Sequence, residues 1–149
     1  MSKIRITKSF SFETGHALYG YDGLCKNVHG HSYKLDVTVI GTPIIDPNHV
    51  KYGMVIDFKD LKKIVKGEIV DVFDHATVFN KNTPHVALAN TLEESGHKVL
   101  LVDYQPTSEE MIIDFAAKIQ AKLPEQIKLH HLRLQETATS FAEWYAADQ

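Results

Sequence analysis

The sequence contains a single cysteine among 149 residues, so the chain cannot form an internal disulfide bond. It has few prolines and glycines, and they form no linker or low-complexity tract. Its apolar runs are short: "KVLLVDY" is strand-sized, so no membrane-spanning segment is expected. The first residues alternate in polarity, unlike a secretory signal. These absences predict one domain over residues 1–149, located in a reducing cytoplasm.

An excess of positive charge is also missing. The 16 Lys and Arg residues are outnumbered by 19 Asp and Glu residues, and the formal net charge is −3. A broad basic surface for nucleic acid is therefore not expected. The apolar fraction of 44% is ordinary for a globular chain.

Polarity alternates with period two in several segments, which predicts half-buried strands. The clearest alternation runs over 4–12 and 29–39, and strands are also expected at 127–136 and 140–146. The apolar segment 97–104 predicts a buried strand.

Three segments predict helices. Residues 57–73 begin at a plausible N-cap, Asp57, and carry an apolar stripe at helical spacing. A short helix is expected over 85–96, and the clearest one lies over 107–124. The expected buried stripe of the first helix is Phe58, Leu61, Ile64, Val65 and Val72. The order of elements predicts an α+β fold with a mostly antiparallel sheet.

Three histidines are predicted to share one face of neighbouring strands. Residues i and i+2 of a strand lie on the same side, so His29 and His31 both extend the apolar face. His16 extends the apolar face of the first strand, unless a bulge at Gly15 shifts the register. Antiparallel pairing across the loop 17–28 would bring the three imidazoles together. Three neutral nitrogens with an open fourth position are typical of a catalytic zinc site.

A histidine on an apolar face is more often a hydrogen-bonded core residue than a metal ligand, and a His-x-His pair alone is a weak signal. The third histidine, facing the same way on the neighbouring strand, favours the metal. Five other histidines have no partner of matching parity and are expected on the surface or in loops: His49, His85, His97, His130 and His131.

Two further residues are candidates for chemistry. Cys25 lies in a loop four positions before His29, where it can fold back beside the histidines. A free cysteine is commonly a small buried apolar residue, but a loop position and a nearby cation favour a thiolate that acts as base or nucleophile. Glu136 follows Leu132 and Leu134 in parity, so its carboxylate faces the core. Burying an unpaired carboxylate costs free energy, so Glu136 is expected to have a partner: an arginine or the guanidine-like edge of a ligand.

Six motifs, in order along nearly the whole chain, resemble the 6-pyruvoyl-tetrahydropterin synthase and 6-carboxy-tetrahydropterin synthase family. They are "FSFETGHAL", "CKNVHGHSYKLDV", "GMVIDFKDLK", "FDHATVFN", "PTSEE" and "QET". The Cys-x-x-x-His-Gly-His element with its upstream histidine is the specific signal. The resemblance implies the tunnelling fold, in which antiparallel sheets with helices on one face join into an oligomeric barrel. It implies a hexamer with active sites at subunit interfaces.

The resemblance also implies roles for individual residues. The implied zinc ligands are His16, His29 and His31. The implied proton-transfer residues are Cys25, Asp74 and His75. The implied pterin-binding residues are Glu136, Thr107 and Ser108. Without the resemblance, Asp74 beside His75 after a helix is more simply interpreted as a chance pairing at the helix C-terminus, with no functional role.

The activity implied is the zinc-dependent conversion of 7,8-dihydroneopterin triphosphate to 6-carboxy-5,6,7,8-tetrahydropterin, with release of acetaldehyde and triphosphate, in queuosine (7-deazaguanine) biosynthesis. Three residues between the cysteine and His-Gly-His resemble the bacterial 6-carboxy enzymes, whereas animal 6-pyruvoyl enzymes tend to have a longer gap. One alternative is a 6-pyruvoyl-tetrahydropterin synthase, which only eliminates triphosphate. Others are a non-catalytic zinc- or pterin-binding homologue, which the intact proton-transfer residues oppose, and a pterin aldolase or cyclohydrolase, which His-Gly-His disfavours.

Two features depart from the family pattern. Ala17 stands where many bacterial members carry arginine, so a phosphate contact must come from elsewhere. The segment 81–105 is longer than in compact members, and the sequence assigns it no role.

Overall fold

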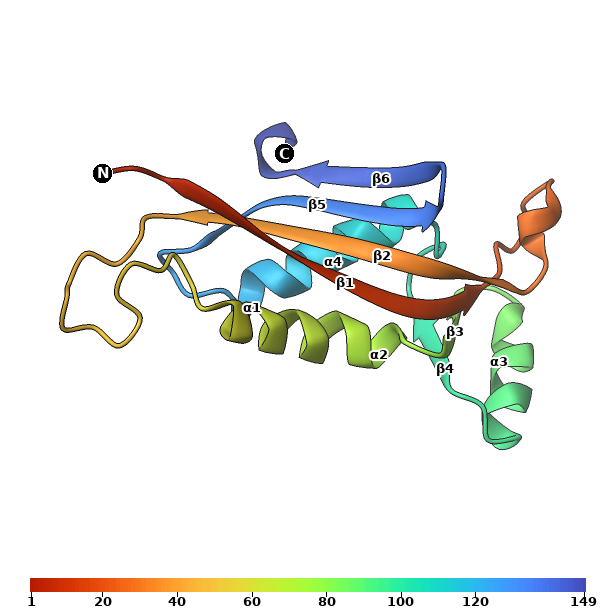
Figure 1. Ribbon diagram of the computed structural model, residues 1–149. Helices are drawn as coiled ribbons and strands as arrows, with labels where there is room; N and C mark the ends of the chain where they lie inside the picture. The colour runs from red at the N-terminus through yellow and green to blue at the C-terminus, as the bar shows by residue number, and fades with distance from the viewer.

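A computed structural model of residues 1–149 contains a six-stranded sheet with the strand order β4-β3-β1-β2-β5-β6 (Figure 1). The strands are β1 (Ile4–His16), β2 (His29–Gly41), β3 (Ala76–Asn80), β4 (Val99–Val102), β5 (Lys128–Thr137) and β6 (Ser140–Tyr145). The α-helices are α1 (Phe58–Val65), α2 (Asp71–Phe73), α3 (His85–Glu94) and α4 (Ser108–Lys122). A π-helical segment, Lys66–Val70, joins α1 to α2, and short 3-10 turns occupy Leu24–Lys26 and Ala146–Asp148.

The sheet is mixed. Strands β1, β2, β5 and β6 pair antiparallel, as predicted, but β3 pairs parallel to β1 and β4 pairs parallel to β3. The sequence did not predict β3, which is only five residues long. Strand β4 forms the sheet edge and is only partly buried, which differs from the buried strand expected at 97–104.

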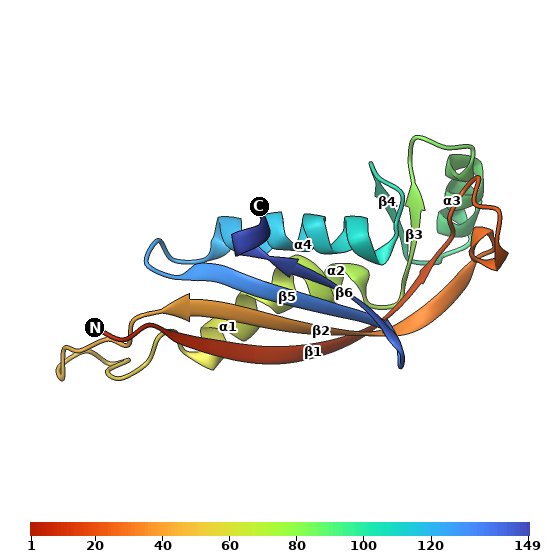
Figure 2. The same ribbon diagram turned by 90° about the horizontal axis from the view of Figure 1, so that it is seen from above.

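The long helices cover one face of the curved sheet, as Figure 2 shows for α1 and α4. Helix α3 packs beside β3 and β4 at the end of the molecule where β1 meets β2. The main core, 21 buried residues, joins the inner sheet face to the helices. No helix of this fold combines the length and apolar character needed to cross a membrane.

The helix expected over 57–73 forms, but its buried stripe differs from the prediction. Asp57 caps it, because its carboxylate accepts a hydrogen bond from the Lys59 N–H at 2.9 Å. The buried residues are Leu61, Val65, Ile69 and Phe73, a spacing of four. A regular helix has about 3.6 residues per turn, so such a stripe would drift around it. The π-helical segment adds a wider turn that keeps the stripe under the sheet.

Strands β1 and β2 pair along their whole length without a bulge at Gly15. In this register His16 lies opposite His29, and Thr14 lies opposite His31. Strand β3 pairs only with residues 14–16 of β1, so the first part of β1 is an open sheet edge. The other edge of the antiparallel part is β6.

Candidate metal centre and substrate pocket

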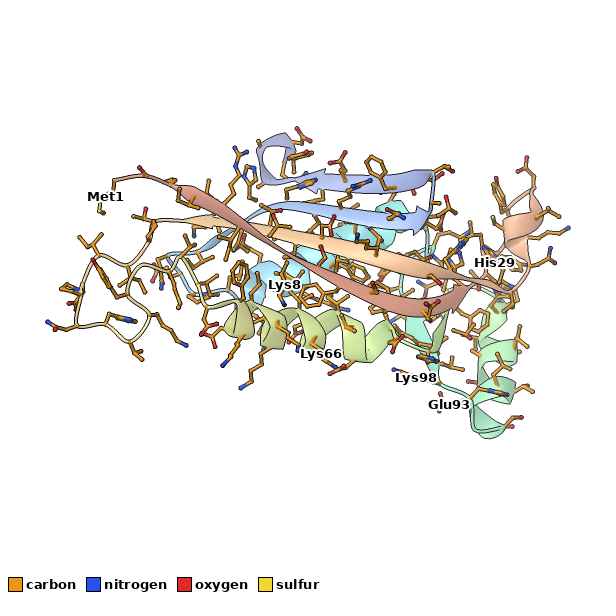
Figure 3. All side chains as sticks on the ribbon, viewed as in Figure 1. Met1, Lys8, His29, Lys66, Glu93 and Lys98 are labelled. Carbon is orange, nitrogen blue, oxygen red and sulfur yellow. The ribbon has the colours of Figure 1, made fainter.

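Three imidazoles meet at one end of the sheet, where β1 ends and β2 begins. The loop 17–28 connects these strands, and Figure 3 shows His29 at this end of the molecule. One ring nitrogen from each of His16, His29 and His31 lies within 4.8 Å of the others. The shared face predicted from strand parity therefore gives a cluster of three potential ligands.

Two backbone carbonyls fix the orientation of two of these rings. The Nδ1–H group of His16 donates to the Pro106 carbonyl at 2.6 Å, and that of His29 donates to the Asn27 carbonyl at 2.7 Å. A carbonyl only accepts, so each neutral ring carries its proton on Nδ1 and a lone pair on Nε2. Hydrogen bonds of this kind, from the ring nitrogen that does not bind metal to a carbonyl, are the contacts that orient metal-binding histidines.

The Nε2 atoms of His16 and His29 lie 3.1 Å apart, although neither neutral ring has a proton to share there. Two nitrogen ligands of one tetrahedral zinc ion are about 3.3 Å apart, given bond lengths of about 2.0 Å. The Nε2 atom of His31 is buried and has no hydrogen-bond partner. An unpartnered buried nitrogen facing two lone pairs fits a metal ion as the missing partner.

Burial also prepares two of these rings for metal binding. It is the largest influence on the pKa of His16 and of His31, and it lowers both. The neutral imidazole is the form that binds metal, so little proton competition is expected near neutral pH.

We expect His31→Ala to lose nearly all bound metal, because two remaining imidazoles do not complete the three-nitrogen set. Metal content per chain, measured by plasma mass spectrometry after exchange against a weak chelator, checks this. The matched control is His131→Ala, since His131 lies on β5 and contacts Glu143 rather than this cluster. Full metal retention in His31→Ala would refute the assignment.

Cys25 lines the same hollow as His16, one of the three clustered histidines. Cys25 lies in the 3-10 turn of the loop that follows β1. The Leu18 N–H donates a hydrogen bond to the Cys25 carbonyl at 3.0 Å. The Cys25 side chain is partly exposed and lines a hollow of about 330 Å³ together with His16, Thr107 and Glu136. A thiol in this position can reach a ligand that also contacts the cluster.

Glu136 borders the same hollow, and its Oε1 atom lies close to the histidines. That oxygen is 3.6 Å from His31 Nε2 and 3.7 Å from His16 Nε2, and the Tyr33 hydroxyl donates to it at 3.4 Å. Burial lowers the pKa of both histidines, which favours their neutral forms over ion pairs with Glu136. No arginine pairs with Glu136, which removes one of the two partners expected from the sequence.

The first turn of α4 forms another wall of the hollow. The Thr107 hydroxyl accepts the Glu110 N–H at 3.2 Å, which caps the helix and leaves the hydroxyl hydrogen free. The Ser108 hydroxyl is buried without a partner. Glu109 and Gln105 line the hollow too, and neither was predicted from the sequence. Glu109 resembles an ordinary first-turn acid, so nothing in the sequence distinguished it.

Asp74 and His75 form a turn between α2 and β3. Asp74 Oδ1 accepts a hydrogen bond from the Glu13 N–H at 2.9 Å and lies 3.0 Å from His75 Nδ1. The Glu13 N–H is the main reason that the pKa of Asp74 is lowered. His75 has a φ of 61°, the one positive value outside glycine, at a cost of about 1–2 kcal/mol. Such strain is typical of functional positions.

The structure does not bring Asp74 and His75 to Cys25. His75 is largely exposed and lines a second hollow of about 300 Å³, with Glu13, Gly15 and Ser32. Thr14, Gly30 and His31 line this second hollow as well, so it borders one of the three clustered histidines. The two hollows share no lining residue.

Two histidines expected on the surface make specific contacts instead. His131 Nε2 lies 2.7 Å from Glu143 Oε2, and its ring stacks on Tyr145. His85 begins α3, and its Nδ1 atom is buried between the rings of Tyr19 and Phe79. Neither belongs to the cluster.

Ala17 is buried against Phe79 and Ala89, beneath α3. An arginine at this position would have to displace that packing.

Comparison with known proteins gives matches over nearly the whole chain. The sequence profile of the 6-pyruvoyl tetrahydropterin synthase family matches residues 5–147. The 6-carboxy-5,6,7,8-tetrahydropterin synthase of Haemophilus influenzae is 40% identical, over 94% of this chain and 97% of that protein. The protein of the same name from Aquifex aeolicus is 30% identical, over 95% of this chain and 98% of that protein.

Solved structures share the fold at lower identity. An uncharacterized protein of Wolinella succinogenes aligns with a TM-score of 0.80 at 20% identity, covering 98% of this chain and 99% of that one. The 6-pyruvoyl tetrahydropterin synthase of Caenorhabditis elegans aligns with a TM-score of 0.69 at 22% identity, covering 98% and 97%. The predicted fold class, with helices on one face of a curved sheet, is confirmed.

Proposed function

The chain belongs to the 6-pyruvoyl tetrahydropterin synthase family, and from this premise we propose that it is a zinc-dependent 6-carboxy-5,6,7,8-tetrahydropterin synthase. Its substrate is 7,8-dihydroneopterin triphosphate, and it releases acetaldehyde and triphosphate. The observation that supports this most strongly is one hollow bordered by His16 of the three-histidine cluster, the Cys25 thiol and the Glu136 carboxylate, which has no arginine partner. The 40% identical relative carries the name of this activity rather than of the 6-pyruvoyl branch.

Glu136 anchors the pterin in this proposal. A pterin presents two parallel N–H groups on its pyrimidine edge, which match the two oxygens of a carboxylate. The Tyr33 hydroxyl, which donates to Oε1, holds the carboxylate in place. Ser108 and Thr107 add hydroxyl groups at the same wall, and the buried Ser108 hydroxyl gains a partner when ligand binds.

His16, His29 and His31 hold the zinc ion. When bound, it supplies a Lewis acid that acidifies the hydroxyl and C–H groups of the substrate side chain. Cys25 lines the hollow at this point and moves the proton as a thiolate. Its exposure to the hollow gives it access to the substrate.

His75 is the partner acid or base, held in one tautomer by Asp74. Since His75 and Cys25 of one chain line separate hollows, a second copy of the chain supplies His75 to the hollow that contains Cys25. The open edge of β1 and the edge strand β6 offer unpaired backbone groups for joining copies into a closed barrel. The assembly proposed is a hexamer.

The proposed setting is queuosine biosynthesis in the cytoplasm. A catalytic thiolate works only while it stays reduced, and the chain offers Cys25 no disulfide partner.

Incubation of the protein with 7,8-dihydroneopterin triphosphate tests the proposal. We expect mass spectrometry to detect 6-carboxy-5,6,7,8-tetrahydropterin, with acetaldehyde formed in equal amount and trapped by a hydrazine reagent. A 6-pyruvoyl product without acetaldehyde would place the protein in the other branch of the family. Pterin binding without any turnover would identify a non-catalytic homologue.

A further inference from the structure

We propose that Lys98 is a positioning residue that holds the peptide unit between Asp74 and His75 and thereby presents the His75 imidazole for proton transfer. This inference rests on the proposed function, because it concerns the acid/base partner of the same site. It also gives a role to the additional segment 81–105, from which Lys98 comes.

The Lys98 ammonium group binds two backbone carbonyls. Its Nζ atom donates to the Asp71 carbonyl at 2.7 Å and to the Asp74 carbonyl at 2.8 Å. These carbonyls lie at the C-terminal end of the helical run 58–73, where carbonyls lack partners within the helix. The partial negative charge of a helix C-terminus also favours a cation there.

Strand β1 holds the same peptide unit from the opposite side. The His75 N–H donates to the Glu13 carbonyl at 2.6 Å, while Lys98 binds the carbonyl of Asp74. The Asp74 carboxylate accepts the Glu13 N–H and lies 3.0 Å from His75 Nδ1. With its carbonyl and its N–H both bound, this peptide unit cannot rotate freely.

The backbone at His75 needs such support. Its φ of 61° is unfavourable for a residue with a Cβ atom, so the neighbouring contacts must hold it. The imidazole itself is exposed and packs against little else. Without Lys98, rotation of the peptide unit would relieve the strain and move the imidazole away from Asp74.

The additional segment places Lys98 by strand pairing. Thr77 on β3 pairs with Val99 on β4, and the Thr77 N–H donates to the Lys98 carbonyl at 3.0 Å. The chain therefore leaves the turn along β3, passes through α3 and returns to the start of β3, from which β4 runs parallel to β3. Figure 3 shows Lys98 at this junction, and Lys66 on the helical run nearby.

The test is Lys98→Met, which keeps the length of the side chain and removes its donors. Lys98→Arg restores donors. The matched control is Lys66→Met, since Lys66 pairs with the Asp71 carboxylate at 3.0 Å and is not bonded to Asp74. In Lys98→Met we expect kcat to fall by about 10- to 100-fold with KM within about threefold, a loss typical of misplaced proton transfer. Lys98→Arg is expected to recover most of kcat, and Lys66→Met to match the wild type.

A second measurement does not depend on turnover. In protein with 15N-labelled histidine, the His75 signal is assigned through His75→Gln, and its ring nitrogen shifts report the tautomer. We expect the wild type and Lys66→Met to hold the proton on Nδ1, and Lys98→Met to show a mixture of tautomers. Wild-type kcat and an unchanged His75 signal in Lys98→Met would overturn the proposal. An inactive wild type would contradict the proposed function alone, because the tautomer measurement would still decide the role of Lys98.

Discussion

Cys25→Ala is expected to lower kcat by about a thousandfold, within the range of about 10²–10⁴ that general acid–base catalysis contributes. The thiol borders the hollow next to the histidine cluster and is partly exposed to it. Alanine removes the group that transfers the proton but fits the space that the thiol occupied. Single-turnover kinetics with 7,8-dihydroneopterin triphosphate measure the loss without interference from product release.

Zinc content and thermal midpoint provide the control for this variant. Both should match the wild type, because Cys25 is not among the three ligands and lies in an exposed 3-10 turn. Cys25→Ser should recover little activity, since a hydroxyl is a far weaker acid than a thiol. Normal turnover in Cys25→Ala would remove this residue from the mechanism and leave His75 as the candidate base.

Glu136→Gln is expected to weaken pterin binding by roughly 2–4 kcal/mol, about 30- to 700-fold in Kd. Glutamine keeps the size of the side chain but replaces one acceptor oxygen by a donor and removes the charge. It would therefore face the two N–H groups of the pterin with one acceptor. Calorimetric titration with neopterin, which lacks the triphosphate, isolates this contact.

The control for this prediction is Glu143→Gln, since Glu143 lies on β6 and pairs with His131 rather than with the cluster. Zinc content separates two roles for Glu136, whose Oε1 atom is within 3.7 Å of two histidines. Unchanged zinc with weak pterin binding supports the anchor. Equal affinity in both proteins would show that Glu136 is structural, and loss of zinc would make it a fourth ligand.

The histidine cluster could be predicted from the sequence because strand alternation is a local property. Once 4–12 and 29–39 are identified as strands, parity decides which side each imidazole occupies, and antiparallel pairing across the loop 17–28 then brings the imidazoles together. The same argument placed Glu136 on the inner face. The register, with His16 opposite His29, came only from the structure.

The surroundings of His75 could not be predicted in this way. Strand β3 is short and joins β1 in parallel, so its pairing depends on residues about 60 positions apart. The left-handed backbone at His75 has no signature in the residue type, and Lys98 resembles any exposed lysine. The buried stripe of the first helix was predicted with Val72 instead of Phe73, because regular helical spacing does not anticipate a π-helical turn.

The π-helical turn has a consequence for how this chain tolerates changes in length. Gly67 faces open space within that turn, so its loss would break no side-chain contact. Removing one residue there would give a regular α-helix, because the buried stripe would then return to ordinary helical spacing. Phe73 would stay in the core, and Asp74 would stay at the end of the helix. The wide turn therefore accommodates one residue more than a regular helix would hold, without moving the acid/base pair that follows it.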